Sequence, residues 1–294
     1  MGKITEKIKQ GKVLISDGAW GTFLQNKGLA IGECPELWNI THPGEVLDIA
    51  RSYIDSGADM IETNSFGGTR FKLEKFNLAD QVFTLNKAAA QISREAAGTK
   101  LVLGSVGPTG KILMMGDVTE DELYEAFKEQ ACGLEAGGVD AVVVETMSDI
   151  DEARIAIKAA KENTQLEVIC TMTFEKTVTG EYRSMMGVSP AEMVQPLLDA
   201  GADIIGANCG NGIAGMVNIV KEIRKINPLI PVLIHANAGM PVYNDGETVF
   251  PEKPEEMAAF IPEIIAAGAN IIGGCCGTTP EHICKIKEAV NKQT

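Results

Sequence analysis

Aromatic side chains are scarce in this sequence, where they make up 5% of 294 residues, whereas glycine is abundant with 31 residues. This combination suits tightly packed helices and short turns better than a β-sandwich. Long apolar runs are also absent, since none approaches the roughly 18 residues of a membrane-spanning helix. The N-terminal residues MGKITEKIKQGK contain no apolar signal core. We therefore expect a cytoplasmic protein that does not contact a membrane.

Positive charge is in short supply as well. The formal net charge is −14, with 26 Lys and Arg against 40 Asp and Glu, and the basic residues form no cluster. Nucleic acid is therefore not expected as a partner. Seven cysteines occur without a secretion signal, so reduced thiols or thiolates on a metal are expected rather than a disulfide framework.

Four segments of the chain resemble one another. Each contains a glycine, then Asp or Asn, then an apolar run that ends in polar or glycine residues. The glycine is typical of a helix end, and the apolar run is typical of a buried strand. The leading glycines are 81, 63 and 67 residues apart, and each gap is long enough for two βα units. The segments are residues 56–68, 137–149, 200–210 and 267–277.

Four further β-rich runs lie between these segments, at residues 12–16, 100–105, 167–174 and 231–239. Helical patterns separate the strands, as in residues 44–57, where apolar residues recur at helical spacing. Eight strands alternating with helices predict an α/β protein, a single-domain (β/α)8 TIM barrel over residues 1–294. A doubly wound open sheet is the alternative, but no G-x-G-x-x-G follows the first strand.

The chemistry of such a barrel lies at the C-terminal ends of its strands. Three carboxylates occur at these ends and are candidates for a functional role: Asp17, Glu62 and Glu145. Cys209 follows the sixth strand, and Cys275 with Cys276 follows the eighth. Inward-facing residues of alternate strands share layers in a barrel, so Cys209 is expected near the cysteine pair.

Neighbouring residues of a regular strand point in opposite directions, so Cys275 and Cys276 can face one ion only where the backbone leaves strand geometry. Gly273, Gly274 and Gly277 permit this. Three thiolates suit Zn²⁺ and leave a fourth position for substrate. Simple packing of a vicinal thiol pair is the alternative interpretation. A helix is expected to begin directly afterwards, with Thr279 as N-cap and Pro280 at its first position.

The other cysteines and the histidines have no such setting. Buried thiols are expected at Cys34, Cys132, Cys170 and Cys284. A satisfied core histidine is expected at His235, inside the seventh strand. His42 precedes a proline in a loop, and His282 falls in the first turn of the last helix.

Seven motifs together resemble the zinc-dependent homocysteine S-methyltransferases, and most closely the homocysteine-binding module of cobalamin-dependent methionine synthase. The resemblance covers roughly residues 8–290, with the motifs DGAWGT, ETNSFGGTR, GSVGPTG, VVETMSD, NCG, NAGMP and GGCCGTTPEHI. It implies that Cys209, Cys275 and Cys276 bind one zinc ion per chain. It also implies that Asp17 and Glu145 hold the amino group of homocysteine.

The resemblance gives two asparagines roles near the zinc ion. Asn237 matches a residue that completes the zinc shell before substrate arrives. Asn208, which precedes Cys209, is expected to support the ligands. No catalytic residue beyond the zinc centre is required, because zinc converts the substrate thiol to a thiolate that attacks a methyl group in line.

The methyl donor is expected to come from outside the chain. No cobalamin-binding D-x-H-x-x-G segment and no second barrel occur in the sequence. A separate corrinoid protein carrying methylcobalamin is therefore the expected partner. The alternatives are a homocysteine or other thiol methyltransferase that uses S-methylmethionine or betaine, and a non-catalytic docking module whose zinc is structural.

Overall fold

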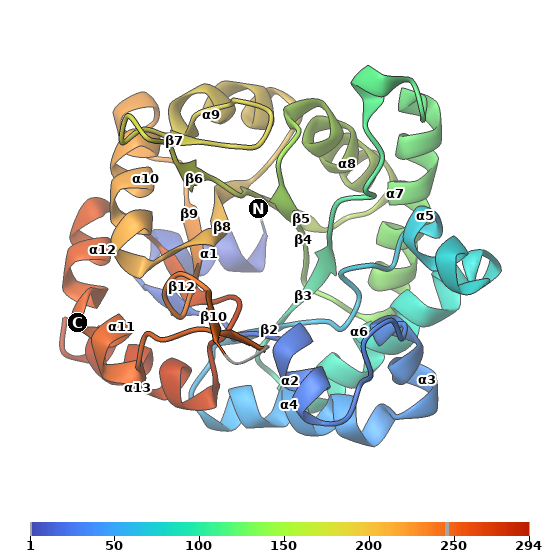
Figure 1. The fold of residues 1–294 in the computed structure, drawn as a ribbon, viewed down its shortest axis with the longest axis horizontal. Coiled ribbons are helices and arrows are strands. Elements are labelled where there is room, and N and C mark those ends of the chain that lie inside the picture. The colour runs from blue at the N-terminus through green and yellow to red at the C-terminus, as the bar shows by residue number, and fades with distance from the viewer. Residues whose placement is uncertain (1, 245–246, 294) are drawn as a thin grey trace.

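Eight parallel strands form a barrel surrounded by helices in the computed structural model, which describes residues 2–244 and 247–293 (Figure 1). The strands pair in the order β1-β12-β9-β8-β5-β4-β3-β2. Between the two ends of this order, Asp59 N donates to Ile15 O at 2.7 Å. The predicted TIM barrel is confirmed, and the open sheet is wrong. The strands are β1 Leu14–Ile15, β2 Met60–Glu62, β3 Leu101–Val106, β4 Ala141–Met147, β5 Glu167–Met172, β8 Ile204–Gly212, β9 Val232–Asn237 and β12 Ile271–Gly274.

The helices that follow the strands pack around the outside of the barrel. The pattern at residues 44–57 forms α4, with Val46, Ile49, Ala50 and Tyr53 fully buried. None of the described helices has the length and apolar character needed to cross a membrane. The outer helices are α4 Pro43–Asp55, α6 Val82–Ala97, α7 Glu120–Gly137, α8 Ile150–Asn163, α9 Pro190–Asp199, α10 Ile213–Ile226, α12 Ile261–Ala267 and α13 Pro280–Asn291.

Short elements occupy the loops at the C-terminal ends of the strands, which form the mouth of the barrel. Two antiparallel hairpins follow β5 and β9, and the sequence did not predict them. They are β6 Glu175–Lys176 with β7 Tyr182–Arg183, and β10 Val242–Asn244 with β11 Glu247–Val249. The short helices are α2 Gly21–Asn26, α3 Trp38–Thr41, α5 Arg70–Leu73, α11 Pro254–Ala259 and the 3-10 turns Pro35–Leu37, Glu74–Phe76, Ala79–Gln81 and Leu113–Met115.

Helix α1 (Lys3–Lys9) closes the opposite end of the barrel, and it is seen through the centre of Figure 1. Its Ile4 is fully buried in an apolar cluster to which all eight strands contribute. The first turn of α1 is fixed because Ile4 N and Thr5 N both donate to the carboxylate of Glu167 on β5. The interior is therefore filled and apolar at this end, which leaves the mouth as the open end.

The four repeated segments share one hydrogen-bonding device, which we call the four Asp/Asn clamps. In each, the Asp or Asn side chain accepts a hydrogen bond of 2.8–3.0 Å from a backbone N–H of the preceding strand. The leading glycine of each has a φ of 96–110°, which a residue with a side chain rarely adopts. The repeat thus reflects a structural need at the N-terminal ends of the strands. The clamps join Asp59 to Ile15, Asp140 to Val102, Asp203 to Val168 and Asn270 to Val232.

Replacing one clamp residue should destabilise the barrel. Asp140 accepts from Val102 N and pairs with both Lys3 and Arg94. Although burial opposes ionisation, hydrogen bonds from Lys3, Arg94 and Val102 N lower the pKa of Asp140. Asp140→Ala leaves these donors unpaired, so we expect the free energy of unfolding to fall by about 2–4 kcal/mol in urea denaturation.

The matched control for this prediction is Lys3→Ala, because the Lys3 side chain is 74% exposed. Its loss should cost less than about 1 kcal/mol. Because the pKa of Asp140 is lowered, its contribution is complete above the ordinary Asp value of about 3.9 and is lost as the pH falls below it. Equal stability of Asp140→Ala and Lys3→Ala would contradict the clamp.

Candidate metal and substrate site

The inside of the barrel changes from apolar to polar toward the mouth. Residues two apart in a strand share one face, so the side chains that follow the apolar inner cluster by two positions also face inward. Met60 is followed in this way by Glu62, Val143 by Glu145, and Leu233 by His235. The resulting layer is buried and consists of Ser16, Glu62, Ser105, Glu145, Thr171 and His235, with Asn208 on β8 beside them.

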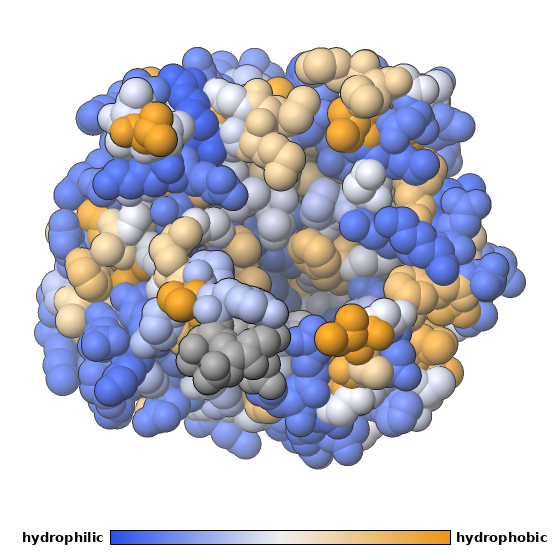
Figure 2. All heavy atoms as spheres, viewed as in Figure 1, coloured by the Kyte–Doolittle hydropathy of each residue, from blue (hydrophilic) through white to orange (hydrophobic). Residues whose placement is uncertain are grey.

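A cavity of about 280 Å³ lies above this layer. Its walls include Glu62, Glu145 and all three cysteines of the predicted zinc site, which are Cys209, Cys275 and Cys276. In the space-filling view of the mouth, a hollow opens at the centre of the molecule (Figure 2). Most of the strand-end residues chosen from the sequence therefore converge on one cavity, whereas Asp17 and Asn237 are not among the residues that line it.

The three cysteine sulfurs lie within 4.8 Å of one another. The Sγ atoms of Cys209 and Cys276 are 4.0 Å apart. Strand β12 ends at Gly274, so Cys275 and Cys276 lie beyond it in a turn closed by the Thr278 N–H donating to Cys275 O. The predicted departure from strand geometry is thus present, and it turns both neighbouring thiols toward Cys209.

Two of the glycines around the pair are required by local geometry. A Cβ on Gly274 would lie 2.2 Å from the hydroxyl oxygen of Thr278, which leaves no room for a side chain. Gly277 has a φ of 78°, in the left-handed region. Thr279 and Pro280 then begin α13 as predicted, with Thr279 N donating to His282 Nδ1 at 3.1 Å.

Cys209 reaches the site through an irregularity in β8. Its φ is 57°, which is uncommon for a residue other than glycine, and the pairing of β8 with β9 shifts register between Asn208 and Gly212. The backbone strain of this bulge turns the cysteine from the barrel wall into the cavity. No sequence rule marks a cysteine for this conformation.

The three thiols influence one another strongly. Hydrogen bonds from Cys275 and Cys276 lower the pKa of Cys209 to about 3. The same interactions raise the pKa of Cys276 to about 12 and that of Cys275 well above its ordinary value. The cluster therefore favours one thiolate on Cys209, and a cation is needed before all three can ionise together.

The donor set of this cluster fits zinc. Asn237 lies beside it, since a hydrogen bond from its side chain lowers the pKa of Cys209 further. The side-chain oxygen of Asn237 is buried and has no hydrogen-bond partner. Three sulfurs plus one available oxygen match the tetrahedral preference of Zn²⁺. Within the described part of the chain, neither a histidine nor a fourth cysteine belongs to this cluster.

The other cysteines divide into two groups. Cys34 and Cys170 are buried, as predicted. The prediction of burial is wrong for Cys132 and Cys284, which are partly exposed. Both lie on outer helices, α7 and α13, where a helix side next to the core stripe is only half covered by its neighbours.

Asp17 is buried at the end of β1, and protein donors already engage its carboxylate. Oδ2 accepts from Trp20 Nε1 at 2.8 Å and from Glu62 N at 2.9 Å, and Oδ1 accepts from Ser16 Oγ at 3.2 Å. Burial raises the pKa of Asp17 to about 6. Its hydrogen bond to Glu62 N also ties β1 to β2 at the mouth.

Glu145 on β4 projects into the cavity and is held from two sides. Ser105 Oγ donates to Oε1 at 2.5 Å, and Asn208 Nδ2 donates to Oε2 at 3.2 Å. Burial raises the pKa of Glu145 to about 7. Asn208 is itself fully buried, and its Oδ1 accepts from Thr146 N and Thr171 Oγ1. Asn208 therefore lies behind Glu145 and positions it.

Glu62, a candidate from the sequence, forms a buried pair with His235, and the sequence did not predict this pairing. Glu62 Oε1 has no hydrogen-bond partner and lies 3.4 Å from His235 Nδ1. Burial lowers the pKa of His235 to about 4, so its ring is neutral, whereas burial raises the pKa of Glu62 well above its ordinary value. His235 Nε2 also lacks a partner, so the expected satisfied core histidine is wrong in that respect. In the sequence, Glu62 and His235 each follow an inward-facing apolar residue, Met60 and Leu233, by two positions. This alternation could have predicted that both side chains face the barrel interior.

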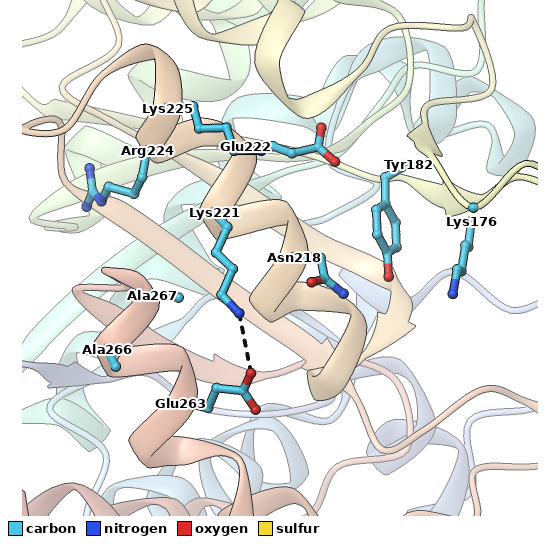
Figure 3. A pocket seen from close by; sticks show the side chains of 11 residues that line it. Lys176, Tyr182, Asn218, Lys221, Glu222, Arg224, Lys225, Glu263, Ala266 and Ala267 are labelled. Atoms are coloured by element: carbon cyan, nitrogen blue, oxygen red, sulfur yellow. Dashed lines mark hydrogen bonds and ion pairs between the residues drawn. The ribbon is translucent and has the colours of Figure 1, made fainter.

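A second hollow, of about 870 Å³, lies on the outside of the barrel between α10 and α12 (Figure 3). Two of its basic residues have partners in the structure. Lys221 pairs with Glu263, and Arg224 bonds to the carbonyl of Gly268 and to Asn270 in the fourth clamp. This hollow reaches the β6–β7 hairpin but contains none of the predicted site residues.

Comparison with known proteins agrees with this geometry. In fold, the chain is similar to the homocysteine methyltransferase MmuM from Escherichia coli. The metallated form of MmuM matches with a TM-score of 0.79 and 20% identity over 97% of this chain and 99% of that one. The oxidized form gives a TM-score of 0.76 and 23% identity over 94% and 95%.

In sequence, the chain is 34% identical to the methionine synthase of Mycobacterium leprae (strain TN) and 33% identical to that of Mycobacterium tuberculosis (strain ATCC 25618 / H37Rv). Each match covers 95% of this chain but 24% and 25% of the relative, so the chain spans about a quarter of their length. Residues 14–290 match the profile of the family described as Homocysteine S-methyltransferase. The chain belongs to the homocysteine S-methyltransferase family.

Proposed function

We propose that this protein transfers a methyl group to the thiol of homocysteine, giving methionine, with one zinc ion held by Cys209, Cys275 and Cys276. The observation that carries the proposal is the convergence of these three sulfurs, within 4.8 Å of one another, on the wall of an acidic cavity. Family membership supports the same reaction.

The cysteines would hold zinc through three thiolates, with the Asn237 oxygen available as a fourth donor until substrate enters. A zinc ion at this position supplies positive charge that favours the thiolate form of an incoming thiol. An open fourth position is typical of catalytic sites, whereas structural zinc sites are closed by four protein ligands. This argues for an enzyme over the alternative of a docking module with a structural zinc ion.

The charge of the cavity supports an amino acid as the thiol substrate. Glu62 and Glu145 line it at the ends of β2 and β4, and Asp17 is buried next to Glu62 at the end of β1. Of the residues that the structure describes, no Lys or Arg lines the cavity. Buried carboxylates without a cationic partner favour a ligand that brings its own positive charge. The protonated amino group of homocysteine provides that charge.

The walls of the cavity favour a donor that is presented by a separate corrinoid protein. A small methylated cation such as betaine is typically held by a cage of several aromatic rings. Among the described residues, Trp20 and Phe66 are the aromatic side chains that line the cavity, and Trp20 is tied to Asp17. Two rings, one of which is held in place by Asp17, are too few to surround a methylated cation.

The rim of the mouth is suited to contact with another protein. Apolar side chains are exposed on the loops around the central hollow (Figure 2). Exposed apolar groups gathered in one region mark interaction surfaces, and methionine adapts well to a partner. The group includes Met114, Met115, Met185, Met240 and Tyr243, which are 55–86% exposed.

A donor comparison tests the proposed function. Zinc-loaded protein and homocysteine would be incubated with a methyl-corrinoid protein, free methylcobalamin, S-methylmethionine or betaine at matched concentrations, and methionine would be measured. We expect the fastest turnover with the methyl-corrinoid protein. Rapid turnover with S-methylmethionine or betaine, and none with either corrinoid, would overturn the donor. No methionine from any donor would overturn the enzymatic function.

A further inference from the structure

Three buried carboxyl groups occur at the mouth of the barrel: Glu62 and Glu145 line the cavity, and Asp17 is buried next to Glu62, whose backbone N–H donates to it. They come from the ends of β1, β2 and β4 and are 1–8% exposed. Burial is the main cause that raises the pKa of each, and the charge of the neighbouring carboxyl groups raises the pKa of Glu62 and of Glu145 further. Such a group is costly to bury without a cation, so the arrangement calls for a positively charged ligand.

The three carboxyl groups differ in how much hydrogen-bonding capacity remains. Asp17 accepts three hydrogen bonds from Ser16, Trp20 and Glu62 N. Glu145 accepts one on each oxygen. Glu62 is 8% exposed, yet its Oε1 has no hydrogen-bond partner. An ammonium group entering the cavity would therefore gain most from Glu62, because its Oε1 accepts no hydrogen bond and only the neutral ring of His235 lies near it.

We propose that Glu62 is a specificity-determining residue that binds the α-ammonium group of the thiol substrate together with Glu145, and that it selects amino-acid thiols over thiols without an amino group. This inference rests on the proposed function, in which the substrate is homocysteine. Asp17 has a different part in this arrangement. It orients Trp20 and fixes the backbone of Glu62, and so acts mainly as a positioning residue.

The nearest alternative is that Glu62 serves only the packing of His235. The two roles of Glu62, contact with His235 and binding of an ammonium group, predict different effects of Glu62→Gln on the stability of the substrate-free protein. If the carboxylate is kept for its polar contact with His235, glutamine should destabilise the substrate-free protein, because it keeps the shape of the side chain but removes the charge and one acceptor oxygen. A carboxylate kept for a cation would not, since removing one of three mutually repelling buried acids relieves the free protein. We expect Glu62→Gln to melt at the same temperature as the wild type or above it.

Binding of two thiols separates these roles directly. Calorimetric Kd values would be measured with zinc-loaded protein for homocysteine and for 4-mercaptobutyrate, which has the same thiol and carboxylate but no amino group. Glu62→Gln should weaken homocysteine binding by about tenfold to a hundredfold, the range expected for one charge-assisted hydrogen bond. It should leave the Kd of 4-mercaptobutyrate unchanged within about twofold.

The matched control is Glu152→Gln. Glu152 is also a buried acid with a raised pKa, but it lies outside the cavity and accepts from Thr109. This variant should bind both thiols as the wild type does. Equal weakening of both thiols by Glu62→Gln, or no weakening of either, would overturn the role of Glu62 and leave the proposed function in place. Failure of the wild type to bind homocysteine would remove the proposed function, and this inference with it.

Discussion

Cys209→Ala is expected to lose most of its zinc and all measurable methyl transfer. One of three thiolates disappears, and zinc binding should weaken by more than about a hundredfold, the upper end of what losing a supporting group around a metal costs. Alanine meets the same backbone strain at a φ of 57° as cysteine does, so the fold itself should be preserved. Metal analysis after dialysis measures the loss, and circular dichroism checks the fold.

Cys284→Ala is the control for this experiment, because Cys284 is a partly exposed thiol on α13 outside the cluster. It should retain one zinc ion per chain. Full zinc retention by Cys209→Ala would refute the ligand assignment. A barrel that unfolds without zinc would instead show that the metal stabilises the fold, contrary to the large apolar core on both sides of the barrel wall.

Glu145→Gln should weaken homocysteine binding by about tenfold to a hundredfold, while the zinc content stays at the wild-type level. The carboxylate accepts from Ser105 and Asn208, so a glutamine amide must turn its NH2 group toward one of these donors. The substitution thus removes the charge and also disturbs the orientation of the side chain. Equilibrium binding of homocysteine measures the effect.

The pH dependence gives a second readout for Glu145. Burial raises its pKa to about 7, so the carboxyl group gains a proton, and loses attraction for an ammonium group, as the pH falls through that value. Wild-type affinity should therefore decline below about pH 7 more steeply than that of Glu145→Gln. If the wild type and Glu145→Gln had the same Kd for homocysteine at every pH, Glu145 would be excluded from substrate recognition.

The barrel could be predicted because its strands and helix ends leave local signals. Buried parallel strands give continuous apolar runs, and the glycines at 57, 138, 201 and 268 mark helix ends that require a positive φ. The two hairpins, β6–β7 and β10–β11, gave no such signal. Their strands have two or three residues each, too few for a period to be visible.

The site was predictable in its chemistry and less so in its geometry. Cysteines at two strand ends identified the cluster, but the left-handed conformation of Cys209 depends on a bulge that tertiary contacts create. The unpartnered state of Glu62 was also invisible, because it depends on which donors the neighbouring strands leave free. Such groups are set by the assembled barrel rather than by their local sequence.

The four Asp/Asn clamps have a consequence for how the chain reaches its native state. Each clamp connects residues separated by 35 to 44 positions, so each closes a loop of similar length. Closing a loop of this size carries a smaller entropy penalty than joining the chain ends, where β1 pairs with β12, by about 1.5 kcal/mol. A quarter of the barrel can thus become ordered as a unit before its neighbours do. Assembly would then proceed by docking of quarters, and ring closure between β1 and β12 would come last.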